Sequence, residues 1–561
     1  MISGRARRMK VYEAVLDQLL GAGVTNFAGM VGSTSAPYAS SLASRNEARY
    51  IAIRHEQVGA SILDATARLS GRPGCLMVHG GSGLLAASLG IAAAALDATP
   101  MVVLSATQER RAMENGWWQT LDVLKPVADF VKFQTRVERP DQAIAAVRDA
   151  LRESVSGKPG VAQIDIPIDV SVEELGDVKI PPPLAVSAPL HRPSPDPAAV
   201  TEAVALIRKA ARPVLLVGGG IVYSGAGAAL LALAERLHAP VVNTPTSRGA
   251  MPESHPLVLG SSGIIGYEPI GDAIREADLV LAVGSRLSDL QLSRGELLRP
   301  DVPIIQAEID AATIGREYTP AVAVVSDAKA FAEAMNAALD GQALEIPEAR
   351  REWTAALDAR YAAWRADWIA SEPDNGQMQP QEVVAELCAQ PLDTIFTHGA
   401  GDHGFYGFMA PVDPPGAHLQ SARLGAMGCA LGLAIGAKWE RPDQPVICCV
   451  GDGDLMLQLG DLETLSRERL PVVLVVFNNF RLGSQRKRVE AYGPVMGVDH
   501  GNPDFAKLAE LFECRGFRVD KPGQFAGALK EALASGQPSI IDVIVDPEAR
   551  PPRIQMSREA R

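Results

Sequence analysis

The amino-acid sequence predicts an α/β fold with three doubly wound domains, each built around a parallel sheet. The chain has 561 residues, which at ~150 residues per domain suggests three to four domains. Short apolar runs of strand length alternate with amphipathic helical stretches along the whole sequence. Because strands separated by helices pair in parallel and are covered by helices on both faces, this alternation assigns the fold class.

Two breaks divide the chain into segments of similar size. The first break is rich in proline, which excludes a helix or a central strand, so we expect a linker on the surface. The second is a charged helical stretch that gives way to a polar segment. The expected division is an N-terminal domain at 1–180, the proline-rich linker at 181–197, a central domain at 198–345, a helical linker at 346–378, a C-terminal domain at 379–550 and a tail at 551–561.

Each segment contains apolar runs that we expect to be buried strands. Their lengths of four to seven residues suit strands better than helices. The expected strands are 74–78, 101–105 and 161–166 in the N-terminal segment, 214–217, 279–283 and 304–309 in the central segment, and 394–397, 446–450, 472–477 and 539–545 in the C-terminal segment.

The C-terminal segment contains the most informative pattern of the sequence. One expected strand ends at Gly451-Asp452-Gly453 and the next at Asn478-Asn479, and four leucines between them keep the spacing of a single helix. Such a crossover places both loops at the carboxyl edge of a parallel sheet, where open α/β sheets bind ligands. Glycines let a phosphate approach the backbone, and carboxylate and amide oxygens are ligands that Mg²⁺ prefers. The pattern therefore predicts a magnesium and diphosphate site.

Composition excludes several classes of protein. A net charge of −13 argues against binding to nucleic acid or to an anionic membrane. The six cysteines show no metal-binding spacing, which indicates buried thiols in a reducing compartment. The longest weakly polar run, at 84–96, is too short to cross a bilayer, and no uninterrupted apolar stretch follows the basic start of the chain. We therefore expect a cytoplasmic protein.

The aspartate and asparagine motif, at this spacing, resembles the signature of enzymes that bind thiamine diphosphate. Matching segments at 29–33, 212–220, 279–286 and 424–437 extend the resemblance over nearly the whole chain, to the acetolactate synthase and 2-oxoacid decarboxylase superfamily. The resemblance implies a pyrimidine-binding N-terminal domain, a central domain and a diphosphate-binding C-terminal domain. It also implies a homodimer or homotetramer in which subunits share active sites.

The resemblance assigns the metal ligands within this motif. Asp452 and Asn479 match the residues that hold Mg²⁺ through side-chain oxygens, and the backbone carbonyl of Arg481 matches a third ligand. Gly451 and Gly453 flank the aspartate and match the glycines that contact the diphosphate.

Four other positions of the C-terminal segment carry expectations. Gly401 and His403 match a loop that touches the diphosphate, and an ordinary surface loop is an equal alternative. Met427 matches the apolar side chain that holds the two cofactor rings in a V shape, a role compatible with packing in the core. Asp454 stands where the family usually has a small residue, and we expect it to cap the following helix.

The cofactor requires a carboxyl group in the N-terminal domain. Thiamine diphosphate loses its thiazolium C2 proton only when a carboxyl group favours the imino form of its aminopyrimidine. The sequence Arg54-His55-Glu56-Gln57 resembles the motif that supplies this group, and Glu56 matches the activating glutamate. The alternative is a glutamate that only stabilises a helix start. Together with the diphosphate signature, the match favours the catalytic role.

Two further residues resemble those of one subfamily. Ser33 and His79 stand where benzoylformate decarboxylases carry a serine and a histidine that contact substrate and move protons. A histidine at a strand end suits proton transfer, whereas a structural histidine is the alternative. The second catalytic histidine of that subfamily is replaced here by Gln291, which argues against an aryl 2-oxo acid as substrate. Gln119 is a further candidate near the substrate.

These observations indicate an enzyme that uses thiamine diphosphate and Mg²⁺ to decarboxylate a 2-oxo acid, and that either releases an aldehyde or ligates the remaining fragment to a second carbonyl. One alternative is an acetolactate synthase-type transferase. Another, from a different class, is a non-catalytic cofactor-binding protein. FAD stays unassigned, because relatives bind FAD, ADP or nothing in the central domain and residues 286–289 match the pattern only in part.

Overall fold

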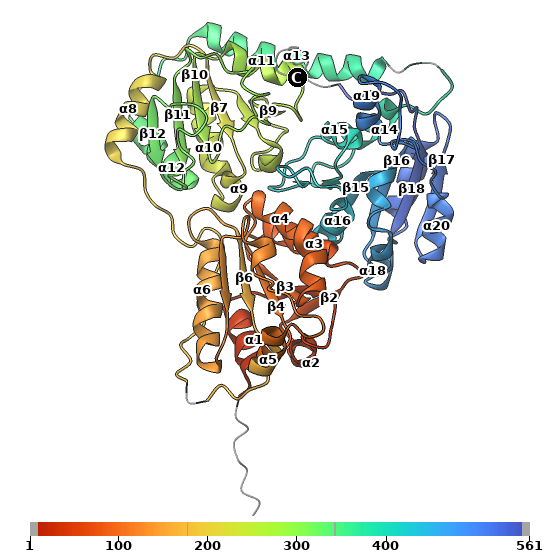
Figure 1. Ribbon diagram of the computed structural model, residues 1–561. Coiled ribbons are helices and arrows are strands. Elements are labelled where there is room, and N and C mark those ends of the chain that lie inside the picture. Colours follow the sequence, from red (N-terminus) through yellow and green to blue (C-terminus); the bar gives the residue numbers. More distant parts are fainter. Residues whose placement is uncertain (1–8, 177, 342–343, 372, 374, 553–561) are drawn as a thin grey trace, which may run out of the picture. The chain divides into compact units, whose positions relative to one another are not determined.

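Three parallel sheets of six strands each organise the chain (Figure 1). The computed structural model describes residues 9–176, 178–341, 344–371, 373 and 375–552. The tail expected at 551–561 lies outside the described residues from position 553 onward. The expected α/β class with three parallel sheets is confirmed.

The N-terminal sheet consists of β1 (Asn26–Gly29), β2 (Arg49–Ala52), β3 (Gly74–His79), β4 (Met101–Ala106), β5 (Phe133–Arg136) and β6 (Val161–Asp165). The helices of this segment are α1 (Val11–Gly21), α2 (Ala36–Leu42), α3 (Glu56–Ser70), α4 (Ser82–Leu96), α5 (Arg110–Asn115), η1 (Lys125–Val127), η2 (Pro140–Gln142), α6 (Ala143–Val155) and α7 (Ile168–Ser171). Helices α3 and α4 pack on one face of the sheet, and α6 packs on the other with α1 beside it (Figure 1).

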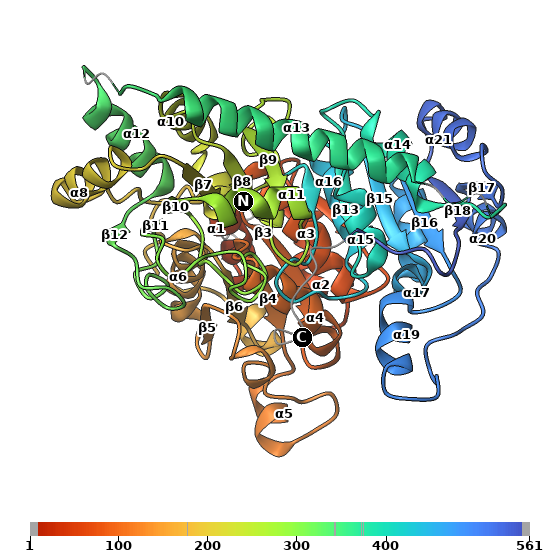
Figure 2. The ribbon, with the colours of Figure 1, turned by 90° about the horizontal axis from the view of Figure 1, so that it is seen from above.

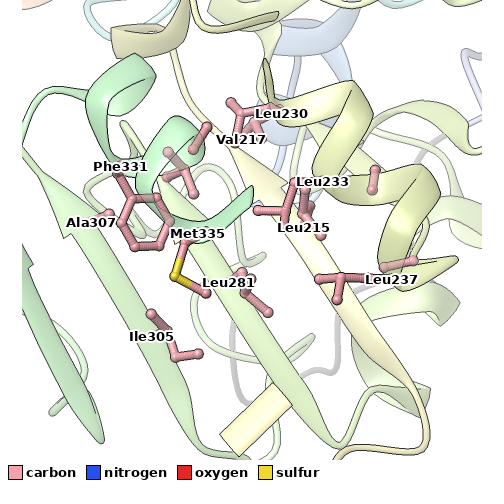
Figure 3. Close-up of a cluster of buried hydrophobic side chains, with 14 of the residues drawn as sticks. Leu215, Val217, Leu230, Leu233, Leu237, Leu281, Ile305, Ala307, Phe331 and Met335 are labelled. Carbon is pink, nitrogen blue, oxygen red and sulfur yellow. The ribbon is translucent and has the colours of Figure 1, made fainter. Parts of the chain in front are cut away.

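The central sheet consists of β7 (Pro213–Val217), β8 (Val241–Asn243), β9 (Val258–Ser261), β10 (Leu279–Val283), β11 (Ile304–Glu308) and β12 (Val322–Val325). Its helices are α8 (Pro197–Ile207), α9 (Gly220–Ser224), α10 (Gly227–Leu237), η3 (Pro245–Ser247), α11 (Glu268–Glu276) and α12 (Ala328–Leu339). Strand residues Leu215 and Leu281 form a buried core with Leu233 of α10 and with Phe331 and Met335 of α12 (Figure 3).

The C-terminal sheet consists of β13 (Ile395–His398), β14 (His418–Leu419), β15 (Val446–Gly451), β16 (Val472–Asn478), β17 (Arg515–Val519) and β18 (Ser539–Ile544). The helices of this segment are α14 (Pro380–Cys388), α15 (Asp402–Gly407), α16 (Ala430–Glu440), α17 (Asp452–Leu455), η4 (Leu459–Asp461), α18 (Leu462–Arg467), α19 (Gly483–Glu490), α20 (Phe505–Leu511) and α21 (Phe525–Ala534). All ten strands expected from apolar runs occur, to within one residue at each end.

The order of strands differs between the sheets. The first sheet runs β2-β1-β3-β4-β6-β5, and the third repeats this order as β14-β13-β15-β16-β18-β17. The central sheet runs β12-β11-β10-β7-β8-β9, which is the strand order of dinucleotide-binding domains. The order changes direction between β1 and β3, between β13 and β15, and between β7 and β10. Open α/β sheets bind ligands at a switch point of this kind.

The chain divides into two compact units. Unit 1 contains the chain up to Leu190 together with Arg423–Pro442 and Gln458–Leu470, and therefore includes α16 and α18. Unit 2 contains His191–Ala422, Asp443–Leu457 and the chain from Pro471 onward. The domain boundaries proposed from sequence stay predictions. No helix of the described residues is long and apolar enough to cross a membrane.

The expected helical linker is α13 (Glu348–Ala370), which runs along both sheets of unit 2 (Figure 2). Its aromatic side chains provide the contact. Tyr361 and Trp364 pack against Tyr267 with ring centroids 6.2 and 5.2 Å away, and Trp368 stacks on Tyr406 at 6.0 Å. Packing of aromatic rings contributes strongly to stability, so α13 is an integral, packed helix of unit 2 rather than a loose connection.

The proline-rich segment is irregular, as expected, and two residues of its first half are anchored in unit 1. Val186 and Ala188 are buried in unit 1. Their backbone N–H groups donate to the carbonyls of Ala22 and Gly71, at 3.0 and 2.8 Å. Alternate residues between the prolines are apolar and turn inward, while the residue between Val186 and Ala188 is exposed.

The expectation of a single helix between β15 and β16 is wrong. The segment forms α17, η4 and α18 instead, and the interruption lies at Gln458, whose backbone leaves the helical region at a φ of −126°. The Gln458 side chain binds the backbone of the loop before α16, where its Oε1 accepts from the N–H of Leu431 at 3.0 Å. Asp461 is fully buried and accepts a hydrogen bond from the backbone N–H of Arg54 at 2.9 Å. These hydrogen bonds override the helical spacing of the leucines.

Helices α3 and α16 pack closely in unit 1 because α16 carries glycines on the contacting face. A Cβ added to Gly432 would lie 2.7 Å from the Cβ of Ser61, and one added to Gly436 would overlap the carbonyl oxygen of Ile62 and lie 2.9 Å from the Cβ of Ala65. This close approach holds the start of α3, which carries Glu56, beside the loop that precedes α16.

We expect Gly436→Ala to cost about 1–3 kcal/mol of stability, because the backbone of α3 cannot yield to a new methyl group. The midpoint of thermal unfolding measures the loss. Gly527→Ala is the matched control, since Gly527 lies in α21 with no atom within 4 Å of an added Cβ. It should be neutral or stabilising by up to ~1 kcal/mol. Equal midpoints for the two variants would contradict the close packing of α3 and α16.

Candidate active site

The first candidate site lies in unit 2, at the switch point of the third sheet. Strands β13 and β15 pair in parallel there, with His398 opposite Cys449. The carboxyl end of β13 leads into the glycine-containing loop 399–401, and β15 ends at Gly451, directly before Asp452 and Gly453 at the start of α17. The structure therefore brings the predicted diphosphate residues Gly401, Gly451 and Gly453 to one edge of one sheet.

Asp452 is the buried anion of this site. It is 3% exposed and begins α17. Its Oδ1 accepts from the N–H of Gly453 at 2.8 Å, and its Oδ2 accepts from Nδ2 of Asn502 at 2.7 Å, with Nε2 of His500 at 3.6 Å. Burial raises the pKa of Asp452 above its ordinary value, and the hydrogen bonds from Asn502 and Gly453 offset part of the rise. A bound cation would remove the remaining cost of the buried charge.

The two asparagines after β16 have different surroundings. Asn478 is fully buried, and its Oδ1 shares the Asn502 amide with Asp452 at 2.9 Å. Asn479 is half-buried, and its Oδ1 accepts from the N–H of Arg481 at 3.2 Å. Arg481 forms an antiparallel bridge with Asp499, which fixes the loop whose carbonyl is the predicted third ligand. The roles of Asn479 and Arg481 as metal ligands stay predictions.

His403 is enclosed by glycines. Added Cβ atoms on Gly399, Gly401 and Gly451 would each lie 2.6 to 2.8 Å from its ring. Gly401 has a φ of +154°, which favours glycine. Burial lowers the pKa of His403 from 6.5 to about 4, and a contact with the backbone of Gly399 partly opposes this. Within the described part of the chain, its buried Nε2 has no hydrogen-bond partner. In the Nε2–H tautomer this buried nitrogen, in a cradle of glycines, is a donor that fits a phosphate oxygen.

Asp454 does not cap the following helix, so that expectation was wrong. It lies within α17 and is 2% exposed. Its Oδ2 accepts from the backbone N–H of Ala400 at 2.9 Å. The extra carboxylate therefore ties the loop after β13 to α17, because it points across the sheet edge rather than along the chain.

The second candidate site lies in unit 1 and centres on Glu56. Glu56 opens α3 and is half-buried. A Cβ added to Gly83, in the first turn of α4, would lie 3.2 Å from its Oε1. The carboxylate therefore lies close to the starts of two helices, where the helix dipoles favour negative charge. Both the catalytic role and the simpler role at a helix start remain compatible with this position.

Gln57 connects this helix start to Met427. Its Nε2 donates to the carbonyl oxygens of Met427 and Gly428, at 3.2 and 2.6 Å. Gln458 donates to the same Gly428 carbonyl. The structure therefore brings Met427, which is half-buried, together with the residue that follows Glu56. That proximity is what the predicted role of Met427 beside the cofactor rings requires.

His79 ends β3, at the switch point of the first sheet, and is half-buried. Its Nδ1 lies 2.7 Å from Oγ1 of Thr34, and its Nε2 lies 3.2 Å from Oε1 of Gln119. Ser33, the hydroxyl predicted from sequence, is exposed in the turn after β1, while Thr34 beside it is 2% exposed. The turn therefore directs Thr34, not Ser33, to the histidine.

The carboxyl edge of the central sheet carries buried polar atoms. Ser262 Oγ donates to the carbonyl of Gln291 at 3.1 Å, so the loop after β10 lies against the end of β9. Four buried polar atoms at this edge have no hydrogen-bond partner among the residues that the structure describes: Asn243 Nδ2, Ser261 Oγ, Gln291 Nε2 and Ser293 Oγ. Buried polar groups left unpaired in a ligand-free chain indicate a ligand position.

Sequence reasoning missed several residues that shape these sites. All of them are polar side chains, and most lie far along the chain from the motif they support. They are Thr34, Gln458, Asp461, Asn478, His500 and Asn502. Asn478 could have been found, since it stands beside the predicted Asn479. No local pattern distinguishes the others.

Comparison with family models matches all three segments. Residues 9–125 match the N-terminal TPP binding domain of thiamine pyrophosphate enzymes, residues 200–335 match their central domain, and residues 399–543 match their C-terminal TPP binding domain.

Three similar proteins cover nearly the whole chain. The probable acetolactate synthase large subunit of Methanocaldococcus jannaschii is 32% identical, over 97% of this chain and 93% of that protein. The acetolactate synthase large subunit of Parasynechococcus marenigrum is 32% identical, over 95% and 87%. The acetolactate synthase of Mycobacterium bovis is 30% identical, over 96% and 88%.

His403 predicts an acid sensitivity of the cofactor-free protein. Its pKa is lowered on folding, so the unfolded chain binds the proton first, and stability falls as pH drops from 6.5 towards 4. The loss at the acid end is on the order of 3 kcal/mol. Asp452, with its raised pKa, acts in the opposite direction, so variants must be compared.

We therefore expect His403→Asn to flatten the decline of the thermal midpoint between pH 6.5 and 4. His191→Asn, at an exposed histidine, is the control and should follow the wild-type curve. A wild-type slope in His403→Asn would contradict the burial of a neutral imidazole at this position.

Proposed function

Because this chain belongs to the thiamine pyrophosphate enzyme family, and within it to the acetolactate synthase and 2-oxoacid decarboxylase superfamily, we propose that it is a carboligase. It decarboxylates a 2-oxo acid and joins the remaining fragment to a second carbonyl compound. The observation that carries the proposal is the buried, partly uncompensated Asp452 at the switch point of the third sheet, beside the glycine cradle of His403.

Mg²⁺ is the proposed partner of Asp452. The donor set of one carboxylate, one amide oxygen and one backbone carbonyl is made of hard oxygen ligands, and Mg²⁺ commonly takes its other ligands from phosphate and water. Asp452, Asn479 and Arg481 would supply the protein oxygens. The described residues hold no cluster of three or more His, Cys, Asp or Glu side chains placed for a metal, which fits an ion held jointly with a phosphate ligand.

The proposed diphosphate site combines the loop after β13 with the start of α17, which Asp454 ties together. His403 Nε2 is the buried donor available to a phosphate oxygen, and Gly401, Gly451 and Gly453 allow close approach of the backbone. An acidic chain can bind a diphosphate this way, because backbone N–H groups and a cation supply the positive charge.

Thiamine diphosphate, when bound, supplies a thiazolium carbon that adds to a carbonyl and accepts the electrons left by departing CO₂. Glu56 is proposed to hold the aminopyrimidine nitrogen through its carboxyl group, at the start of α3. Met427 would orient the rings, and Gln57 fixes the backbone that carries Met427. In this proposal the chain binds the cofactor, orients its rings through Met427, and holds one proton at Glu56.

A second candidate function is release of an aldehyde, and His79 favours it. Its ring is held at both nitrogens by Thr34 and Gln119 at the edge of the first sheet. A histidine fixed in this way can deliver a proton to a bound fragment before a second carbonyl arrives. Carboligation and aldehyde release therefore compete at one point of the reaction.

We propose a homodimer or homotetramer with shared active sites, acting in the cytoplasm. Helix α4 supports an assembly, because it exposes Leu85 and Leu89, which lie one turn apart and are 50% and 41% exposed. An apolar stripe of this kind is a common feature of subunit interfaces.

We also propose an adenine nucleotide, FAD or ADP, at the carboxyl edge of the central sheet. The dinucleotide-type strand order and the four unpaired buried polar atoms support it. Protein purified without added nucleotide, once denatured, should release an adenine-containing compound in near-stoichiometric amount. Mass spectrometry identifies the compound, and a visible absorption band distinguishes FAD from ADP. Absence of any nucleotide, together with no thermal shift on adding FAD or ADP, would remove this site.

The central experiment gives the protein thiamine diphosphate, Mg²⁺ and a panel of 2-oxo acids, with and without an acceptor carbonyl. Mass spectrometry should find products that combine a decarboxylated donor with an acceptor. Glu56→Gln should still bind the cofactor but turn over roughly 10²- to 10⁴-fold more slowly. Asp452→Asn should instead lose the rise in thermal midpoint that Mg²⁺ and the cofactor give the wild type.

Asp520→Asn, at an exposed aspartate, is the control and should keep both binding and turnover. Free aldehyde as the only product would favour the second candidate function. Tight cofactor binding without turnover of any 2-oxo acid would indicate the non-catalytic alternative. An unchanged thermal response in Asp452→Asn would remove Asp452 from the metal site.

A further inference from the structure

We propose that Thr34 is a positioning residue that holds His79 as the Nδ1–H tautomer, so that Nε2 is the atom that exchanges a proton with bound substrate. Gln119 is proposed as the partner of Nε2 in both of its protonation states. These roles rest on the proposed function, in which His79 delivers the proton for aldehyde release.

The tautomer follows from counting hydrogens around Thr34. A threonine hydroxyl has one hydrogen to donate and two lone pairs that accept. The Thr34 hydroxyl contacts the carbonyl oxygen of Ala106, which can only accept, so the hydroxyl hydrogen is used there. His79 Nδ1 lies 2.7 Å from the same oxygen. Nδ1 must therefore carry a hydrogen and donate it, which leaves Nε2 as the free nitrogen of the neutral ring.

The fold keeps these three groups together. His79 and Ala106 are paired neighbours at the ends of β3 and β4, so the carbonyl and the imidazole have a fixed separation. Gly32 lets the turn after β1 approach them, because a Cβ there would lie 2.8 Å from the Cβ of His79. Thr34 is buried at this approach, so solvent does not compete for its hydroxyl.

Gln119 suits an atom that gains and loses a proton. Its amide oxygen lies 3.2 Å from Nε2 and accepts from it when Nε2 is protonated. A half-turn of the amide gives up the hydrogen bond that Gln108 Nε2 donates to the same oxygen at 3.3 Å, and presents the NH₂ group, which donates to the bare lone pair. Gln119 is exposed and has a φ of +59°, a left-handed conformation that is uncommon for glutamine and occurs often at functional sites.

The proton balance of the step is simple. The neutral ring takes a proton at Nε2 from water and gives that proton to the bound substrate, while Nδ1 keeps its hydrogen bond to Thr34 throughout. The hydroxide left by the water combines with the released CO₂ as bicarbonate, so one 2-oxo acid anion and one water give one aldehyde and one bicarbonate. The ring returns to its starting state without any further reactant. Thr34 therefore acts through His79 and does not touch the substrate.

The test measures the tautomer of His79 directly, in the full chain and without cofactor. The protein is labelled with ¹⁵N at the imidazole nitrogens, and the His79 signals are assigned by their loss in His79→Gln. At alkaline pH the wild type should show a protonated Nδ1 and a bare Nε2. Thr34→Val removes the acceptor, so the ring should shift towards the Nε2–H form that is usual in water. An unchanged tautomer in Thr34→Val would overturn the proposal.

Two controls separate a positioning role from loss of packing. Thr34→Ser keeps the hydroxyl and should restore the Nδ1–H form, and Ser33→Ala, which changes the neighbouring exposed hydroxyl, should leave it intact. Thr34→Ala replaces Thr34→Val if the latter does not fold, and it should show the same shift. A shift in Ser33→Ala as large as in Thr34→Val would overturn the assignment to Thr34.

A kinetic measurement tests whether the tautomer of His79 affects the rate of aldehyde release. Thr34→Val should slow aldehyde release by roughly 10²-fold and change its pH profile, since a wrong tautomer disables proton transfer. Thr34→Ser should recover both. If wild type releases no aldehyde from any 2-oxo acid, the second candidate function fails, while the ¹⁵N measurement still decides whether Thr34 sets the tautomer.

Discussion

The structure depends on one constraint: a carboxylate, Asp452, is buried at the edge of a parallel sheet with only part of its charge compensated. Burying an ionised group is costly unless hydrogen bonds or a cation compensate it. Asn502 and the N–H of Gly453 supply hydrogen bonds, and Asn502 extends the network to Asn478. The segments around β15 and β16 thus hold this charge in place, as the proposed cation site requires.

Glycines leave the space that the functional groups occupy. Three glycines enclose His403, Gly83 leaves space for the carboxylate of Glu56, and Gly32 lets the first turn reach His79. In the same way, Gly432 and Gly436 allow α16 to pack closely on α3. In each case a single methyl group would fill the space that a ring, a carboxylate or a backbone requires. These positions are therefore restricted by contact rather than by turn geometry alone.

The first and third sheets share one strand order, and each places its candidate residues at the switch point of that order. His79 follows β3 in unit 1, and Asp452 follows β15 in unit 2. The central sheet has a different order and carries none of the predicted catalytic residues. Its unpaired polar edge suits a bound nucleotide, so the three sheets divide the proposed functions among them.

The sequence by itself determined the class of fold, the ten apolar strands and the residues that follow them. It could do so because buried strands of a parallel sheet are apolar throughout, and because a motif at a strand end needs no long-range information to be placed. Short or edge strands such as β14 and β17 were not predicted. Strand β14 has only two residues and β17 is only half-buried, so neither leaves a clear apolar pattern.

Only the tertiary structure decided what each side chain contacts. It directed Thr34 rather than Ser33 to His79, aimed Asp454 at Ala400 instead of a helix end, and broke the expected helix at Gln458. Each outcome depends on hydrogen bonds between segments far apart in the chain. A buried polar group takes whichever partner the fold brings near, because leaving it unpaired costs more than a favourable local conformation gains.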